Sequence, residues 1–280
     1  MNNTLNINRF GKILKHDGLN FFPNMILTLS IIWAIPVVLY LFTSLIPGNE
    51  GQTFDPFSRI DIISSLLTIV LIIAPARLYK HCNDPRKGIG YAMLPASTLE
   101  KFLSMVIYCV IVTPIIYVAG ALAIDSILAL FNGPYEGFAL SYYFDTFAKI
   151  NAVFEKENVM LDGSWLLFYN SLSPTFMLIL SLLGTLTISS IFMFSNMIFK
   201  KHKNGKMIGI LILLFIITMI VFINYVANHH TIFESMNEEN ADMIVKQVMI
   251  FTTNITFYLE IIISSLMLFG VYRKIKTQKY

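Results

Sequence analysis

The stretch Met25-Ile-Leu-Thr-Leu-Ser-Ile-Ile-Trp-Ala-Ile-Pro-Val-Val-Leu-Tyr-Leu-Phe-Thr-Ser-Leu-Ile46 contains no charged residue. About 20 apolar helical residues are enough to cross the hydrocarbon core of a bilayer, which is roughly 30 Å thick. Five further stretches have the same character, so the sequence predicts an all-α integral membrane protein with six transmembrane helices. The predicted spans are residues 25–46, 62–79, 102–131, 172–199, 207–227 and 248–272.

The composition of the whole chain agrees with this prediction. Of its 280 residues, 56% are hydrophobic and only 13% are charged, whereas an average soluble domain has roughly 45–50% and about 25%. A soluble fold of this size would have too few charged residues to cover its surface, and a disordered chain would be less apolar. The two cysteines, Cys82 and Cys109, are too few for a disulfide framework or a zinc site. We therefore expect no metal and no other cofactor.

The basic residues predict the orientation of the spans, because cytoplasmic loops carry an excess of Lys and Arg. With six spans, 16 of the 20 Lys and Arg residues fall on one side, in the two termini and in the loops after spans two and four, with Arg77 at the margin of span two included. The side of the other three loops holds 13 of the 17 acidic residues. An odd number of spans would mix the two sets. Both termini are therefore predicted to be cytoplasmic, in the cell inner (cytoplasmic) membrane.

The residues before the first span form a separate unit in this prediction. Residues 1–24 are predicted to be a cytoplasmic amphipathic arm, and residues 25–280 a single six-helix transmembrane domain. On a helix, Ile7, Phe10 and Ile13 share one arc with Leu14, while the basic residues and His16 occupy the opposite arc. Such a helix can lie in the membrane interface. The alternative is a basic flank that only sets the topology, which explains the charges but not their segregation to one arc.

The predicted external loops differ in length. Residues 132–171 form a long loop with several aromatic residues, and such loops usually have structure or function. The loop at residues 47–61 is short, with Arg59 in it, and the third loop, residues 228–247, is acidic. His229 and His230 are interpreted as solvated loop residues, since neighbouring helical side chains point about 100° apart and do not form a metal site.

The loop between spans two and three carries the clearest local signals. Ser97-Thr98-Leu99-Glu100 is a capping box, so a helix is predicted to begin there. Pro95 disfavours helix at Leu94 and therefore breaks the chain just before this start. The short apolar run Gly90–Leu94 lies on the predicted cytoplasmic side, where it is expected to be buried against another part of this chain or a separate subunit.

This loop also resembles a known family. The runs Arg86-Lys87-Gly88, Tyr91-Ala92-Met93-Leu94-Pro95-Ala96-Ser97 and Glu100-Lys101 are similar to the segment between the second and third spans of type-2 ABC exporter permeases. In that family the segment is a coupling helix that docks on a separate ATP-hydrolysing subunit, and an amphipathic helix precedes the first span. The resemblance implies the following docking residues: Gly88, Tyr91, Met93, Leu94, Pro95, Ser97 and Glu100.

The spans hold few ionisable residues. Glu260 lies near the middle of the sixth span, where a charge costs at least ~2.5–3.5 kcal/mol. It is either a group in a translocation path or a neutral carboxyl that hydrogen-bonds between helices, with the hydroxyls of span four as candidate partners. Asp125 is close to the outer end of span three and is expected to reach water. Ser181, Thr185 and Ser189 share one face of span four and are expected to pack against another helix.

The motifs of catalysis are missing from the sequence. It contains no phosphate-binding loop, no H-E-x-x-H pair and no G-x-S-x-G turn. We therefore expect that the chain is not an enzyme and that any ATPase activity belongs to a partner. The expected partners are that ATPase subunit, a second permease subunit in a homodimer or heterodimer, and the lipid bilayer, with no nucleic acid. The alternative is a membrane sensor, immunity or assembly protein that acts through its external loops.

Overall fold

The computed structural model describes residues 5–45, 55–83, 91, 93–131, 135, 137–145, 147–148, 174–199, 202–228 and 238–277. The regular elements in these parts of the chain are helical. They are α1 (Ile7–Leu45), α2 (Pro56–Leu78), a 3-10 turn (Lys80–Asn83), α4 (Thr98–Val106), a π-helical turn (Ile107–Val112), α5 (Thr113–Ala129), α8 (Pro174–Ile198), α9 (Lys203–Asn228) and α11 (Glu238–Thr277).

Among the residues that the structure describes, six helices are long and apolar enough to cross a membrane, which confirms this part of the prediction. The third is a continuous helix, Thr98–Ala129, made of α4, the π-helical turn and α5. The structure corrects the start of the second span, because α2 begins at Pro56, not at residue 62. Proline is favoured in the first helical turn, where its missing N–H has no intrahelical partner. Arg59 therefore belongs to this helix and not to a loop.

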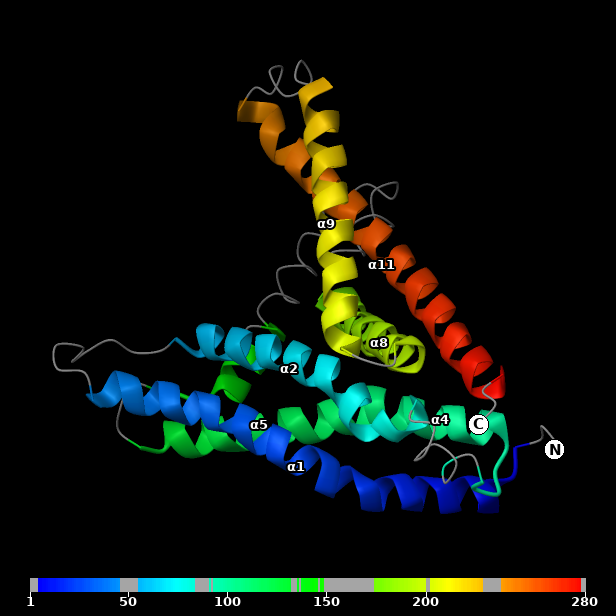
Figure 1. The fold of residues 1–280 in the computed structure, drawn as a ribbon. Helices are drawn as coiled ribbons and strands as arrows, with labels where there is room; N and C mark the ends of the chain where they lie inside the picture. The colour runs from blue at the N-terminus through cyan, green and yellow to red at the C-terminus, as the bar shows by residue number, and fades with distance from the viewer. Residues whose placement is uncertain are drawn as a thin grey trace.

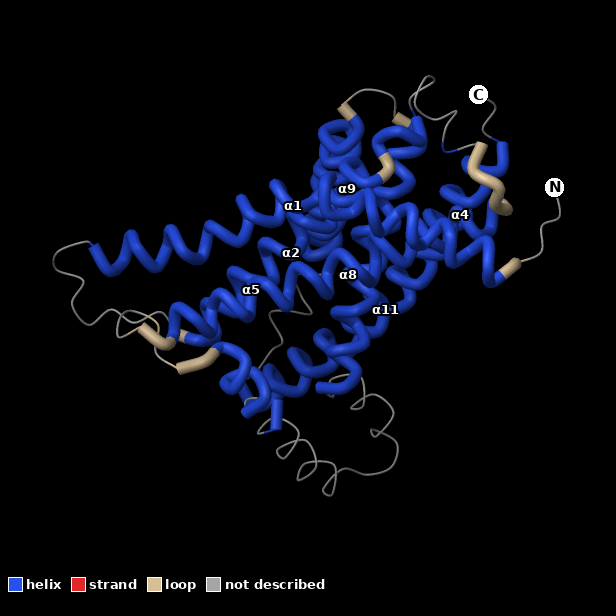
Figure 2. Tube along the Cα trace, turned by 90° about the horizontal axis from the view of Figure 1, so that it is seen from below, coloured by secondary structure: helices blue, strands red, loops and turns tan. Residues whose placement is uncertain are grey.

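The helices form two groups that α8 joins. In the first group α1, α2 and α5 lie side by side and contact one another (Figure 1). In the second group α9 and α11 diverge from these three helices, and α8 contacts both α2 and α11 (Figures 1 and 2). Over the stretch Lys203–Ile220 of α9, most of the apolar surface is consequently not covered by other described parts of this chain.

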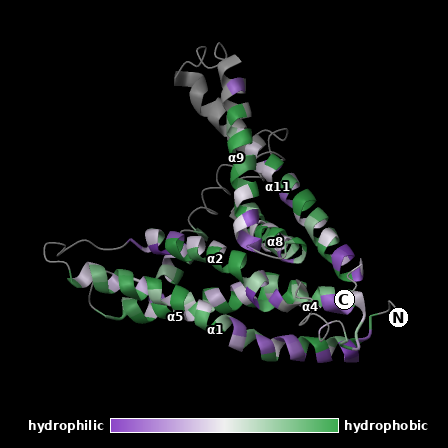
Figure 3. Cartoon of the chain, viewed as in Figure 1, coloured by the Kyte–Doolittle hydropathy of each residue, from purple (hydrophilic) through white to green (hydrophobic). Residues whose placement is uncertain are grey.

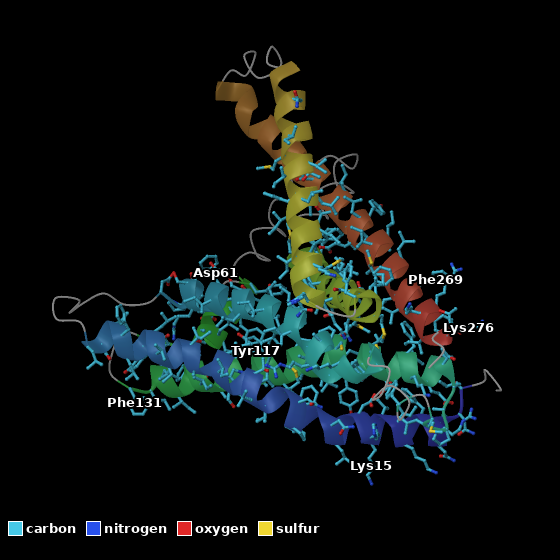
Figure 4. The ribbon with its side chains drawn as sticks, in the orientation of Figure 1. Lys15, Asp61, Tyr117, Phe131, Phe269 and Lys276 are labelled. Carbon is cyan, nitrogen blue, oxygen red and sulfur yellow. The ribbon has the colours of Figure 1, made fainter. Side chains whose placement is uncertain are left out.

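The basic segments of the chain meet at one end of the bundle, which we call the basic end. The first turn of α1 and the last turn of α11 both lie at this end (Figure 1). Side chains show the same division: Lys15 and Lys276 lie toward the basic end, and Asp61 and Phe131 lie toward the opposite end (Figure 4). Figure 3 shows hydrophilic residues along the first half of α1 and at the start of α9.

The core of the first group joins α1 to the third span. Phe21 and Met25 of α1 are almost fully buried, as are Met105 and Cys109. Trp33 packs against Gly120, where a Cβ atom would collide with the indole ring. The Trp33 Nε1–H also donates to the carbonyl of Tyr117 at 3.1 Å. These contacts hold the predicted arm residues and the first span as one continuous helix, α1, against its neighbours.

The third span is irregular immediately before Pro114. The turn Ile107–Val112 is π-helical, and the hydroxyl of Thr113 donates to the carbonyl of Tyr108 at 2.7 Å. Proline removes a backbone donor, so a nearby hydroxyl or a local change of helix type must satisfy the exposed carbonyls. Pro114 is thus accommodated within the continuous helix Thr98–Ala129, although proline usually breaks a helix.

Candidate functional site

The predicted docking segment lies at the basic end, directly before α4. Tyr91 is buried and packs edge-on against Tyr79 of the α2 end, with ring centroids 6.3 Å apart. Met93 points out of the protein and is 78% exposed, whereas Leu94 packs partly against the core. Pro95 is exposed. Gly88, also predicted to be a docking residue, lies outside the described residues.

The capping box at the start of α4 is confirmed. The backbone N–H of Glu100 donates to Ser97 Oγ at 3.2 Å, and the N–H of Ser97 donates to Glu100 Oε2 at 2.8 Å. Both residues are buried. The box satisfies two of the amides that have no partner inside the helix, so the third span begins at a fixed position after the exposed turn.

Glu100 also holds the start of α1, which the sequence did not reveal. Its Oε1 accepts from the backbone N–H of Asn6 at 2.8 Å and from Arg9 Nη2 at 3.2 Å. The Asn6 side chain in turn caps α1, because its Oδ1 accepts from the N–H of Asn8 at 3.0 Å. A single buried carboxylate therefore joins the N-termini of two helices, and each terminus favours its negative charge.

A second buried carboxylate, Asp17, was also missed. Its Oδ2 accepts from the Tyr79 hydroxyl at 3.0 Å and from the Ser104 hydroxyl at 2.6 Å. His16 Nδ1 lies 3.2 Å from Oδ1. The only signal in the sequence is the spacing of Asp17 four residues after Ile13 and four before Phe21, on the apolar arc of the arm. The bonds tie α1 to the end of α2 and to α4.

The junction of α8 and α9 contacts the same end of α2. Asn196 Nδ2 donates to the carbonyls of Pro75 and Tyr79 at 3.1 and 3.0 Å. Lys203 Nζ donates to Asn196 Oδ1 at 2.7 Å. Cys82 lies buried in this region. Burial is the main cause that raises the pKa of its thiol, and the negative charge of Asp17 raises it further. The end of α2 is thus bonded to α1, α8 and the start of α9.

At the opposite end, the structure corrects the expectation for Asp125. This residue is 3% exposed and forms a buried ion pair with Arg59, whose Nη1 lies 3.0 Å from Asp125 Oδ1. Arg59 Nη2 also donates to the carbonyl of Gly137 at 2.8 Å, and the N–H of Ala139 donates to Asp125 Oδ2 at 3.3 Å. The guanidinium lies 4.7 Å from the centre of the Tyr135 ring. Asp125 does not reach water because these groups from the following segment cover it.

Glu260 lies in α11 where that helix packs on α8. Its Oε1 lies beside Gly184 of α8, at 3.5 Å from the position that a Cβ atom there would take, which is an ordinary van der Waals distance. Its Oε2 is buried and has no hydrogen-bond partner among the described residues. The hydroxyls of Ser181 and Thr185 donate to carbonyls of their own helix. Thr187 bonds to the backbone carbonyl of Glu260 at 3.4 Å and not to its carboxyl group.

The face of small residues on α8 is buried only toward one end. Ser189 is fully buried, whereas Ser181 is exposed. Within the described parts of the chain, no group of His, Cys, Asp or Glu residues is arranged to hold a metal ion. The buried hydrogen bonds at the basic end position the helices around the predicted docking segment. Glu260 is a separate candidate site, within the sixth span.

Comparisons of this chain with protein-family models, with curated proteins and with solved structures gave no match.

Proposed function

We propose that this chain is the membrane-spanning permease subunit of an ABC-type exporter, driven by a separate ATP-hydrolysing subunit that docks on residues 88–100. The observation that carries the proposal is the exposed turn at Met93 directly before the buried contacts of Glu100. Met93 is 78% exposed, so its side chain is available for contact with a docked subunit. Glu100 and Tyr91 hold the same turn against three helices.

This arrangement gives a path for movement from the docking segment to the spans. A displacement of the turn pulls on α4 through the capping box, on α1 through the Asn6 and Arg9 bonds of Glu100, and on the end of α2 through Tyr91. Coupling of this kind needs contiguous packed groups between the two sites. Hydrolysis is assigned to the partner because the sequence has no phosphate-binding loop. The uncovered surface of α9 leaves room for a second permease subunit.

The experiment is co-purification of this chain with a co-expressed P-loop ATPase that lacks membrane spans, and ATPases from genes adjoining that of this chain are tested first. Met93→Asp should remove the ATPase from the purified complex. Ile7→Asp is the matched control, because Ile7 is also 78% exposed at the basic end and an acidic residue is favourable in the first turn of a helix. Retention of the ATPase by Met93→Asp, or its equal loss from both variants, would overturn the docking assignment.

The second candidate function is a membrane sensor, immunity or assembly protein that works through its outer loops. The observation in its favour is the buried Arg59–Asp125 pair, which fixes residues 137–139 to the outer end of the bundle. Deletion of residues 149–171 discriminates between the two functions. A permease keeps its ATPase after this deletion, whereas a protein that acts through the loop loses its external partner.

A further inference from the structure

A groove at the basic end is not used by the proposed docking. Two adjoining cavities of about 410 Å³ each lie between α1, the last turn of α2 and the start of α9, and they share Ala76, Lys80 and Asn204. We call them together the basic groove. Its polar lining consists of Asn24, Arg77, Lys80, His202, Lys203 and Asn204.

The basic groove is strongly positive. Arg77 and Lys80 are exposed, and no carboxylate of the described residues lies within ion-pair distance of either side chain. The nearest helices carry two buried acids, Asp17 and Glu100, and both are engaged in the contacts given above. The first turn of α9 also lines the groove, and the positive end of a helix dipole attracts anions.

The position of the groove favours a lipid over a soluble anion. It lies beside the last turn of one spanning helix and the first turn of another, so it is at the edge of the apolar region. Ile73 and Ala76 form its apolar wall, and the neighbouring surface of α9 is exposed and apolar at Ile208 and Ile212. Basic pockets between spanning helices are typical sites for anionic headgroups.

Asn204 lines both cavities of the basic groove. Its Nδ2 donates to the carbonyl of Ile72 at 3.0 Å, which fixes the orientation of the amide. Its Oδ1 is buried and accepts no hydrogen bond from the described residues. This amide therefore shapes the groove from within, and the lining groups that a ligand can reach are the exposed Arg77 and Lys80, which fit a phosphate.

We propose that the basic groove binds the headgroup of an anionic phospholipid, such as phosphatidylglycerol. The headgroup phosphate lies against Arg77, Lys80 and the start of α9. The acyl chains extend along the exposed apolar side of α9. This site is independent of the proposed exporter function, because neither its residues nor its test involve the ATPase.

The experiment measures lipid retained by the purified full-length chain with native mass spectrometry, after mixing with micelles that contain phosphatidylglycerol or phosphatidylcholine. The groove variant is Arg77→Gln with Lys80→Gln. The matched control is Lys274→Gln with Lys276→Gln, which removes the same charge from exposed positions on α11 at the same end. We expect the groove variant to retain at least fivefold less phosphatidylglycerol than the unmodified chain and the control to retain an unchanged amount.

Further arms make the result decisive. Ala76→Asp, which places a negative charge in the groove, should give a similar loss without removing any basic residue. The proposal would be overturned if both groove variants retained as much phosphatidylglycerol as the unmodified chain, or if the groove and control variants lost equal amounts. Displacement of the lipid by millimolar inorganic phosphate would assign the site to a soluble anion and also overturn it. Equal retention of phosphatidylcholine and phosphatidylglycerol would show that the headgroup charge is not recognised.

Discussion

The guanidinium of Arg59 and the carboxylate of Asp125 lie 3.0 Å apart, and both side chains are buried although 66 residues separate them in the chain. Arg59 comes from the first turns of α2 and Asp125 from the last turns of α5. Their contact closes the end of the first group of helices that lies opposite the basic end. It also binds the start of the next segment through Gly137 and Ala139.

The first prediction concerns the stability that this pair provides. Asp125→Ala should lower the free energy of unfolding by about 3 kcal/mol, because removal of one partner leaves the charge of Arg59 buried and uncompensated. The double variant Arg59→Met, Asp125→Leu should recover part of this loss, since neither charge remains. Chemical unfolding of the purified chain in detergent measures both. Asp61→Asn, an exposed acid on α2, is the control and should have little effect. A double variant less stable than Asp125→Ala would contradict the interpretation.

The second prediction concerns the two helix starts that Glu100 joins. Glu100→Ala removes the acceptor of the Asn6 and Ser97 amides, so hydrogen exchange should become at least tenfold faster in both residues 5–12 and 95–102. Exchange measured by mass spectrometry on the purified chain gives this result. Asp125→Ala should not change exchange in these segments. Acceleration in residues 95–102 alone would show that the bond to α1 is not formed.

The third prediction concerns the pH dependence of cysteine reactivity. Burial and the negative charge of Asp17 raise the pKa of the Cys82 thiol, and Cys109 is fully buried. The thiolate is the reactive form, so alkylation of the native chain by N-ethylmaleimide should stay slow from pH 7 to pH 9. A cysteine introduced at the exposed position by Met93→Cys should react rapidly and show the ordinary rise near pH 8.5. Equally fast alkylation of the native cysteines in the folded chain would contradict the buried environment.

The fourth prediction concerns orientation. Because the native cysteines are buried, single introduced cysteines report the two ends of the bundle without replacing Cys82 or Cys109. A membrane-impermeant maleimide should label Met93→Cys only in inverted vesicles and Asp61→Cys only in intact cells. This outcome would place the basic end in the cytoplasm, as the distribution of Lys and Arg predicts. The reverse pattern would contradict that prediction.

The sequence predicts the helices well and their contacts poorly, for a physical reason. A span needs only a sufficient length of apolar residues, which is a local property, and all six predicted spans correspond to helices. The capping box at Ser97 is also local and was predicted correctly. The contact between Arg59 and Asp125 depends on how two distant helices pack, and no sequence period encodes it. The predictions that Arg59 lies in a loop and that Asp125 reaches water were therefore both wrong.

The same limit applies to the residues at the basic end. Asp17 lies on the apolar arc of α1, where the sequence shows only an acid among apolar residues. Its partners Tyr79 and Ser104 come from two other helices. Likewise, the bond from Glu100 to Asn6 joins residues 94 positions apart. Such bonds depend on how distant helices pack, so the sequence alone does not predict them.

The fifth prediction concerns Glu260. Its Oε2 is buried without a hydrogen-bond partner among the described residues, and a buried polar atom in this state costs roughly 1–3 kcal/mol. Glu260→Leu should therefore increase the thermal stability of the purified chain. If the carboxyl group serves a translocation path, the same change should reduce the transport-linked ATPase activity of the complex at least tenfold, because proteins commonly keep destabilising groups where function needs them. Thr256→Val, one turn away on α11, is the control; its hydroxyl bonds to its own helix and its loss should change neither quantity. A destabilised Glu260→Leu variant would indicate that the carboxyl group makes a structural hydrogen bond, and full activity would remove Glu260 from the path.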